Sequence, residues 1–317
     1  MTPEQVDRAE GALLGAAVGD ALGVPYEFGS AEVGRDGPEM LGGGLGDFAP
    51  GEWSDDTAML WCIADVAATG ADLRSESALD QVARNFRQWF DTSPADIGIQ
   101  TRRVLAEGGP EPTAAALAAT SHDLHRQTGR TAGNGSLMRT APVALAHLDD
   151  PVALVEAAQR VSRLTHYDPL AGDACALWCL AIRHAVLDGE FELRTGLELL
   201  AGDASVRWAD IIEEAEQSEP GSFTDNGYVV VALQAAWSSI VRTDASAPDQ
   251  HVADTLSRTI GIGVDTDTVA AITGALLGAR WGAAAVPARW RDAVHGYPGI
   301  TGADLAALAR TTVEGRA

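Results

Sequence analysis

The sequence predicts an all-α protein that forms a single compact domain across residues 1–317. Apolar residues recur at helical spacing in one segment after another, and the alternating pattern of β-strands is nearly absent. Glycine and proline gather in the stretches between those segments, where they mark turns and loops. Hydrophobic residues make up 46% of the chain and charged residues 21%, a balance typical of a globular protein with a sizeable core.

The expected helices follow one another along the whole chain. The first, 4–23, carries apolar residues at helical spacing and closes in glycines. The others are expected at 57–68, 76–89, 94–106, 113–119, 138–147, 151–164, 172–188, 192–201, 208–216, 225–242, 251–261, 267–281 and 287–294, with a last short helix after residue 296.

Charge and cysteine content exclude several functions. The formal net charge of −23 argues against binding to a phosphate backbone, because such binding depends on clustered basic residues. All 22 basic residues are arginine, so lysine chemistry such as Schiff bases or a P-loop lysine is absent. Cys62, Cys175 and Cys179 lie in apolar contexts, where they are expected to be buried and free rather than a disulfide framework or a metal site.

The chain shows no targeting pattern. Its start, MTPEQVDRAE, is polar and acidic and lacks the basic region of a secretory signal. No uninterrupted apolar run is long enough to span a bilayer. A cytoplasmic location without a membrane partner is therefore expected.

Two aspartates stand side by side in GEWSDDTAML, residues 51–60, where a polar loop becomes an apolar run. The simple interpretation is helix capping, with Ser54 as the N-cap and Asp55 and Asp56 in the first turn, where carboxylates suit the helix dipole. On this stretch alone, capping is the favoured interpretation. The alternative is a metal site, which requires further ligands elsewhere in the chain.

A second acidic helix start provides those ligands. Asp265, Asp267 and Thr268 precede an apolar segment within GIGVDTDTVAAITGALLGARWG, residues 261–282. The two clusters together offer four carboxylates and two hydroxyls, an all-oxygen set that suits Mg²⁺ or Mn²⁺ and has room for two cations. Both following segments are apolar nearly all round and should be buried, so their acids would repel one another unless a cation neutralised them. Taken jointly, the clusters favour a metal site.

Further polar features lie between the expected helices. GDALGVPYEF, residues 19–28, ends the first helix with Asp20 and presents Glu27 after a proline-containing turn. Asp20 is interpreted as a helix-end residue or a hydrogen-bond partner that fixes the loop. The stretch 126–139 contains TAGNGS, which lacks the lysine and spacing of a P-loop, although its glycines let backbone N–H groups approach an anion.

Seven blocks, in order, resemble the ADP-ribosylglycohydrolase family. They are GALLGAAVGDALGVPYEF, GEWSDDTAML, PADIGIQTRRVL, TAGNGSLMRTAPVAL, LTHYDPLAGDACALW, DNGYVVVALQAAW and GVDTDTVAAITGALLGA, and they cover most of the chain. The resemblance implies an all-α fold, a centre of two divalent cations (Mg²⁺ or Mn²⁺), and hydrolysis of the glycosidic bond between ADP-ribose and a modified acceptor.

The resemblance also implies roles for individual residues. The metal ligands would be Ser54, Asp55, Asp56, Asp265, Asp267 and Thr268, with serine at position 54 where the family usually has threonine. Glu27 matches the family's loop glutamate and is the candidate catalytic carboxylate, acting beside Asp56 and Asp267. The ADP-ribose contacts would be Gly133, Asn134, Gly135, Ser136, His166 and Tyr228, the last as an aromatic platform for adenine. Asp96 resembles an acid near the scissile bond, where it would pair with a guanidinium.

Several functions remain open at this stage. The leading substrate is an ADP-ribosylated protein with arginine as the acceptor, and free ADP-ribose is an expected ligand. Serine, a small molecule or a nucleic acid are alternative acceptors, the last requiring a local basic patch from Arg102, Arg103, Arg126, Arg130 and Arg139. A non-catalytic ADP-ribose-binding relative would have no need of buried carboxylates. A phosphohydrolase with two metals would usually have histidine among its ligands, and neither acidic cluster contains one.

Overall fold

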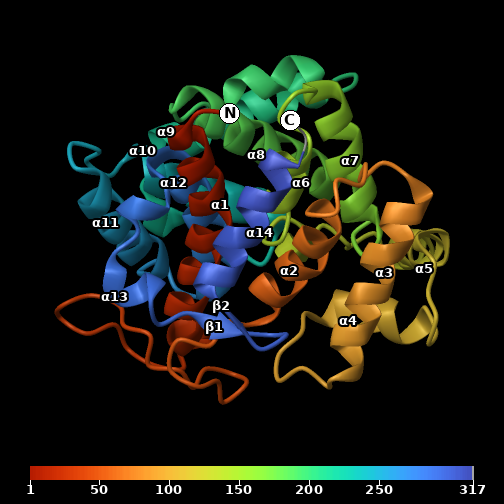
Figure 1. Cartoon of the computed structure of the whole chain (residues 1–317), viewed down its shortest axis with the longest axis horizontal. Coiled ribbons are helices and arrows are strands. Elements are labelled where there is room, and N and C mark those ends of the chain that lie inside the picture. Colours follow the sequence, from red (N-terminus) through yellow and green to blue (C-terminus); the bar gives the residue numbers. More distant parts are fainter. Residues whose placement is uncertain (316–317) are drawn as a thin grey trace.

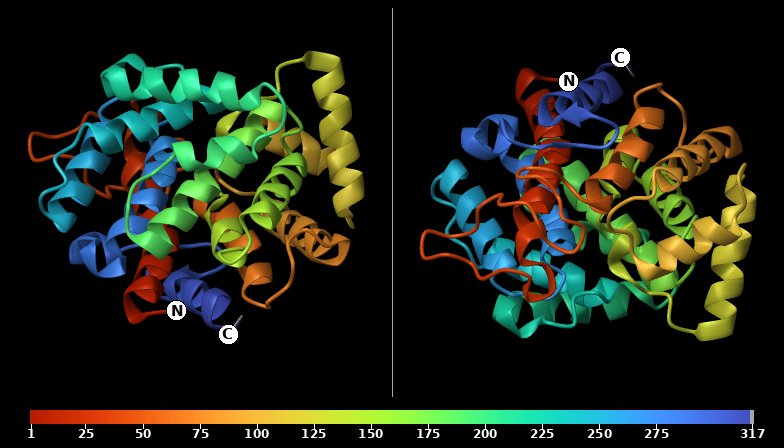
Figure 2. Two further views of the ribbon diagram at one scale, coloured as in Figure 1. Left: turned by 90° about the horizontal axis from the view of Figure 1, so that it is seen from above. Right: turned by 90° about the horizontal axis from the view of Figure 1, so that it is seen from below.

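Two long helices, α1 (Pro3–Gly23) and α12 (Thr266–Trp281), pack side by side through the middle of the molecule in the computed structural model, which describes residues 1–315. Figure 1 shows them surrounded by the remaining helices. The start of α1 and the end of α14 (Gly302–Glu314) lie near each other in every view (Figures 1 and 2). The predicted all-α fold is confirmed, since the only strands among the described residues are two of two residues each.

Glycines allow the two central helices to approach closely. Gly11 and Gly15 of α1 face Gly278 and Gly274 of α12, and a Cβ atom at any of these positions would overlap the opposing backbone. The pairing runs in opposite directions along the two helices, so the end of α1 meets the beginning of α12. Gly23 there lies against the backbone of Asp267. The close packing therefore places the acidic residues of these two segments together.

The other elements cover this central pair. The α-helices are α2 (Asp55–Ala67), α3 (Glu76–Asp91), α4 (Ile99–Glu107), α5 (Ala114–Thr128), α6 (Ala141–Ala146), α7 (Pro151–Arg163), α8 (Pro169–Asp188), α9 (Ala204–Gln217), α10 (Val229–Val241), α11 (Pro248–Ile260) and α13 (Ala288–Arg291). Short 3₁₀ helices are η1 (Val24–Gly29), η2 (Asn134–Ser136), η3 (Arg194–Leu199), η4 (Pro220–Ser222) and η5 (Ala283–Ala285). Strands β1 (His295–Gly296) and β2 (Ile300–Thr301) form one antiparallel hairpin.

Three expected helices differ most from the structure. The helix expected at 94–106 begins only at Ile99, because the preceding residues form a loop in which the Gly98 N–H donates to Asp55 Oδ2 at 3.2 Å. The helix expected at 113–119 continues to Thr128 and ends where Gly129 adopts the left-handed conformation. The segment expected at 192–201 contains only the 3₁₀ helix η3.

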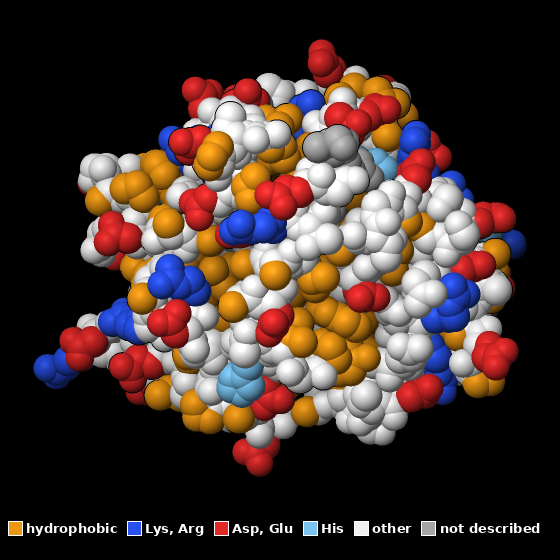
Figure 3. Space-filling model, in the orientation of Figure 1, with side chains coloured by type: hydrophobic (Ala, Val, Ile, Leu, Met, Phe, Trp, Pro, Cys, Tyr) orange, Lys and Arg blue, Asp and Glu red, His pale blue; other side chains and the backbone are white. Residues whose placement is uncertain are grey.

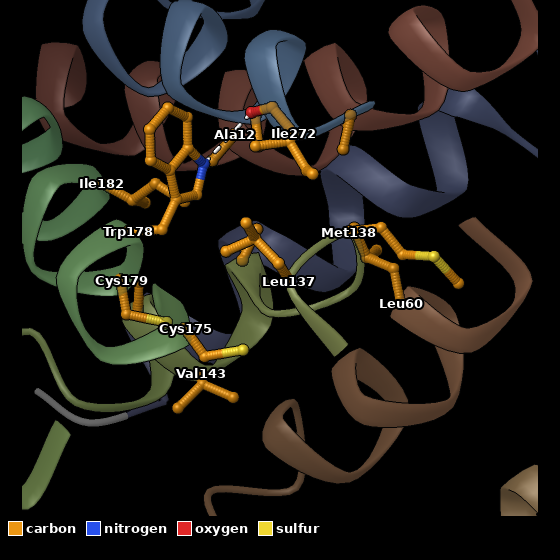
Figure 4. Close-up of a cluster of buried hydrophobic side chains, with 14 of the residues drawn as sticks. Ala12, Leu60, Leu137, Met138, Val143, Cys175, Trp178, Cys179, Ile182 and Ile272 are labelled. Atoms are coloured by element: carbon orange, nitrogen blue, oxygen red, sulfur yellow. Dashed lines mark hydrogen bonds between the residues drawn. The ribbon is translucent and has the colours of Figure 1, made fainter. Parts of the chain in front are cut away.

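A buried apolar cluster joins α8 to the central helices and α6. Figure 4 shows Trp178 of α8, whose indole N–H donates to the Ile272 carbonyl oxygen at 3.1 Å, close to Leu137 and Ile182. All three cysteines are free and buried, as the sequence predicted. By length and composition, α8 is apolar enough to cross a membrane, but 78% of its apolar window is buried inside the structure, as in the core helix of a globular domain.

Candidate active site

A cavity of about 450 Å³ opens where the first turns of α2 and α12 meet. Ligand pockets are commonly of this size. Its wall also includes η1, the loop before α4 and the glycine-rich loop at residues 133–135. The predicted site residues in the wall are Glu27, Asp55, Asp96, Gly133, Asn134, Gly135, His166, Asp265, Asp267 and Thr268.

The first turn of α2 serves both as a cap and as part of the acid cluster. Ser54 is the N-cap, and its Oγ accepts from the Asp56 N–H at 3.5 Å while donating to Asp56 Oδ2 at 2.9 Å. Asp55 accepts from the Gly98 N–H. The capping interpretation of GEWSDDTAML is therefore correct for Ser54, whereas both carboxylates are buried and turned to other partners.

Asp20 ties α1 to the start of α2. Its carboxylate accepts from the Ser54 N–H at 2.9 Å, the Thr57 N–H at 2.9 Å and the Thr57 hydroxyl at 2.6 Å. The expectation that Asp20 fixes a neighbouring loop by hydrogen bonding is confirmed. One oxygen of Asp20 also lies within 4.8 Å of oxygens of Asp56 and Asp267, so this residue belongs to the acid cluster itself.

At the start of α12, Asp265 is held by two asparagines. Asn134 Nδ2 donates to Asp265 Oδ2 at 2.8 Å, and the Asp265 N–H donates to Asn226 Oδ1 at 3.1 Å. Asp265 is the N-cap residue of α12, but its side chain makes no capping hydrogen bond to the described residues of the helix. A cap does not account for this carboxylate.

Burial and mutual repulsion disfavour the charged forms of these acids. Burial is the largest effect on each, raising the pKa of Asp20 to about 6 and that of Asp55 to about 7. The pKa values of Asp56 and Asp267 are raised well above the ordinary value by burial, with neighbouring carboxylates adding to the shift. A cation bound among these carboxylates would offset the free-energy cost of their charged forms.

The residues present fit divalent cations. Oxygens of Asp20, Asp56 and Asp267 lie within 4.8 Å of one another, and so do oxygens of Glu27, Asp96 and Asp267. Asp56 Oδ1 is buried and has no hydrogen-bond partner among the described residues, so its lone pairs are available to a cation. Carboxylates and hydroxyls are the ligands that Mg²⁺ and Mn²⁺ prefer.

Glu27 lies at a kink within η1, where its own backbone is non-helical with a φ of −56° and a ψ of 130°. Its side chain is buried, and burial followed by repulsion from Asp96 raises its pKa to about 9. The next residue, Phe28, has a φ of 47° and donates its N–H at 2.7 Å to the carbonyl oxygen of Val264, which has a φ of 66°. Left-handed backbone at a β-branched residue is strained, and such strain is concentrated at functional sites.

His166 forms the wall behind the glycine-rich loop. A Cβ atom at Gly135 would lie 3.1 Å from its ring. Arg139 donates to Thr165 Oγ1 at 2.6 Å, and the same oxygen is hydrogen-bonded to His166 Nδ1 at 2.8 Å. Burial and the nearby Arg139 lower the His166 pKa to about 3. The ring is therefore neutral near pH 7, with one nitrogen as a donor and the other as an acceptor.

Two of the predicted ADP-ribose contacts lie outside the cavity wall, as do the predicted metal ligands Ser54 and Asp56. Ser136 is buried and accepts from the Ser162 hydroxyl at 2.9 Å. Tyr228 is 37% exposed and pairs with Gly133 through an isolated antiparallel bridge, one residue beyond Gly227, which does line the cavity. Asn134 lines the cavity, but its side-chain amide donates to Asp265 and to the Asn226 carbonyl oxygen.

Sequence reasoning missed several residues of this site. Asn226 positions Asp265, and the only feature of the sequence that pointed to it was the DNG triplet before α10. Gln100 and Met138 also line the cavity, but no sequence motif distinguishes them. Arg139 was considered for a basic surface patch, and this is wrong because its side chain is completely buried against the Phe86 ring.

Fold and cavity together describe an all-α protein with an acidic, oxygen-rich candidate active site where the first turns of α2 and α12 meet. The family described as ADP-ribosylglycohydrolase matches residues 1–317, and the chain belongs to that family. A solved structure titled ADP-ribosylglycohydrolase-related protein complex superimposes with a TM-score of 0.71 at 29% identity, covering 99% of both chains.

Three curated relatives agree with this assignment. The chain is 31% identical to ADP-ribosylarginine hydrolase Tri1 of Pseudomonas putida, over 93% of this chain and 76% of that protein. It is 30% identical to ADP-ribosyl-[dinitrogen reductase] glycohydrolase of Rhodospirillum rubrum, over 91% of this chain and 90% of that protein. It is 25% identical to ADP-ribosylhydrolase ARH3 of Danio rerio, over 92% of this chain and 87% of that protein.

Proposed function

We propose that this protein hydrolyses the glycosidic bond between ADP-ribose and an arginine side chain of a modified protein, with Mg²⁺ or Mn²⁺ bound in the acid cluster. The observation that carries the proposal is the convergence of buried carboxylates from α1, α2 and α12 at one end of a ligand-sized cavity. The names of the relatives from Pseudomonas putida and Rhodospirillum rubrum support the same kind of reaction.

The chain's own residues account for substrate positioning. The backbone N–H groups of Gly133 and Gly135 would donate to the diphosphate, and the neutral His166 ring adds a polar group to the same cavity wall. Divalent cations held by Asp55, Asp56, Asp265, Asp267, Ser54 and Thr268 would supply Lewis-acid binding of the ribose hydroxyls. Asp96, in the same wall, offers a carboxylate to the guanidinium of the acceptor.

The chemical step exchanges one bond for another at C1″ of the ribose. The bond from C1″ to the guanidine nitrogen breaks through an oxocarbenium-like state, and a water oxygen bonds to C1″. The proton released by the water passes to the leaving nitrogen. The Glu27 carboxyl, which lines the cavity within 4.8 Å of Asp96 and Asp267 oxygens, is placed to carry it.

The test is release of ADP-ribose from two peptides, one ADP-ribosylated on arginine and one on serine, with Mg²⁺ and then with excess EDTA. We expect metal-dependent release from the arginine peptide. Release from the serine peptide alone would overturn the choice of acceptor. ADP-ribose binding without release from either would favour a non-catalytic relative.

A further inference from the structure

A second cavity adjoins the first and shares two acids with it. It measures about 350 Å³, and Asp55 and Asp96 line both cavities. Its remaining wall comes from the segment before α2, the end of α3 with the loop that follows, and the turn of the β1–β2 hairpin. Hydrophobic side chains gather over α2 beside this hairpin in Figure 3. The two cavities thus meet at Asp55 and Asp96.

The wall of the second cavity combines aromatic rings with negative charge. Tyr297 is the partly exposed ring of this wall and packs edge-on against Trp61 with ring centroids 5.5 Å apart, while Trp53 and Trp89 border the cavity from the core. Glu52 adds a carboxylate to those of Asp55 and Asp96. Among the described residues, this lining contains no arginine or histidine. Such a surface favours a cation with a flat face, because aromatic rings and carboxylates both attract it.

Hydrogen bonds hold this wall in place. The backbone N–H of Trp53 donates to the His295 carbonyl oxygen at 3.0 Å, and the backbone N–H of His295 donates to the Gly51 carbonyl oxygen at 3.0 Å. At the end of α3, the Thr92 hydroxyl donates to the Trp89 carbonyl oxygen at 2.6 Å. A cavity formed in advance loses little conformational entropy when it binds a ligand.

We propose that the second cavity is the acceptor subsite, which receives the guanidinium of the modified arginine and the peptide that carries it. This inference rests on the proposed function. With the ADP-ribosyl group in the first cavity, the scissile bond lies beside Asp55 and Asp96, and the acceptor extends past them. The planar guanidinium stacks on aromatic rings and donates to carboxylates, whereas the neutral oxygen of a serine acceptor gains neither interaction. The subsite therefore selects arginine.

Thr92 provides the test, because it is exposed at the rim of this cavity and lies outside the acid cluster and the first cavity. Thr92→Arg adds a positive charge that opposes the guanidinium. We expect KM for the ADP-ribosyl-arginine peptide to rise at least about tenfold, a loss of about 1.4 kcal/mol of binding, while Kd for free ADP-ribose is unchanged. Thr92→Glu should leave KM unchanged or lower it.

Thr69 offers a matched control. It is also an exposed threonine just beyond a helix end, and its hydroxyl donates to the Val66 carbonyl oxygen at 2.7 Å, as that of Thr92 does to Trp89. Thr69→Arg should change neither KM nor Kd. If the wild type is active and Thr92→Arg has the same KM as the wild type, the subsite is overturned but the proposed function is not. The same holds if KM rises equally in Thr92→Arg and Thr92→Glu. A wild type inactive on both peptides would overturn the proposed function.

Discussion

The hydroxyl of Thr268 lies 3.4 Å from Asp56 Oδ2, although 212 positions separate the two residues in the sequence. One belongs to the first turn of α12 and the other to the first turn of α2. Asp56 Oδ2 also accepts from Ser54, while its Oδ1 has no hydrogen-bond partner among the described residues. The two helix starts, which the sequence alone presents as separate caps, therefore form one polar cluster. One carboxylate oxygen of that cluster is free to coordinate a cation.

Replacement of an acid in this cluster should separate activity from stability. Asp56→Ala or Asp267→Ala should abolish turnover and weaken Mg²⁺ binding, measured by kinetics and calorimetry. In EDTA, Asp267→Asn should raise Tm, because it removes a buried carboxylate whose charged form is disfavoured. Asp249→Asn, at an exposed site in the first turn of α11, is the control and should change none of these quantities. Full activity in either alanine variant would contradict the site.

The metal-free protein should lose stability as the pH rises. The pKa values of Asp20, Asp55 and Glu27 are raised to about 6, 7 and 9, so the folded state binds these protons more tightly than the unfolded chain. The stabilisation from these bound protons is complete at pH values below the ordinary carboxyl pKa of 3.8 to 4.5. It is lost progressively as the pH rises to about 9. Thermal unfolding in EDTA across this range should show Tm falling, and added Mg²⁺ should reduce the fall. A Tm that does not change with pH in EDTA would mean that ionisation of these acids does not destabilise the folded protein.

Glu27→Gln tests the proton carrier. Glutamine keeps the size of the side chain but cannot exchange a proton, so hydrolysis should slow by about 10² to 10⁴. ADP-ribose binding should change little, since the substitution leaves the cavity volume intact. Single-turnover rates and the Kd for ADP-ribose provide the comparison. Unchanged hydrolysis would assign proton transfer to water alone.

Tyr228→Ala tests the adenine platform. Stacking of a base on an aromatic ring contributes about 1–3 kcal/mol, so KM should rise by about ten- to a hundredfold while kcat falls much less. Tyr228→Phe retains the ring and should preserve KM. A fall in kcat alone, or no change in either constant, would show that adenine does not stack on this residue.

The glycine contact between α1 and α12 should be essential to the fold. Gly274→Ala would place a methyl group against the Gly15 carbonyl oxygen, and we expect a loss of at least about 2 kcal/mol in the free energy of unfolding. Gly172→Ala in α8 is the matched control, because its Cβ would lie 3.4 Å from Gln159 Cγ, an ordinary contact. That variant should gain about 0.5–1 kcal/mol from helix propensity. Urea unfolding of both variants measures the difference, and equal stabilities would contradict the close packing.

Much of the fold could be predicted because helices are encoded locally. The apolar spacing of residues 4–23 and 267–281 gave the two central helices to within a residue, since their periodicity is long and uninterrupted. The helix expected at 94–106 began five residues late, because the Gly98 N–H is used by Asp55 from another part of the chain. A local pattern carries no information about such a partner.

The sequence by itself determined the residue types of the site, namely acids and hydroxyls at two buried helix starts, and the resemblance that joined them. Tertiary structure decided which atoms meet. It brought Asp20 into the acid cluster, turned the Asn134 amide onto Asp265, and directed Ser136 into the core toward Ser162. The reason is physical: helical periodicity depends on neighbours within a few residues, whereas contacts between helices depend on how closely two backbones pack. The glycines of α1 and α12 determine that approach here.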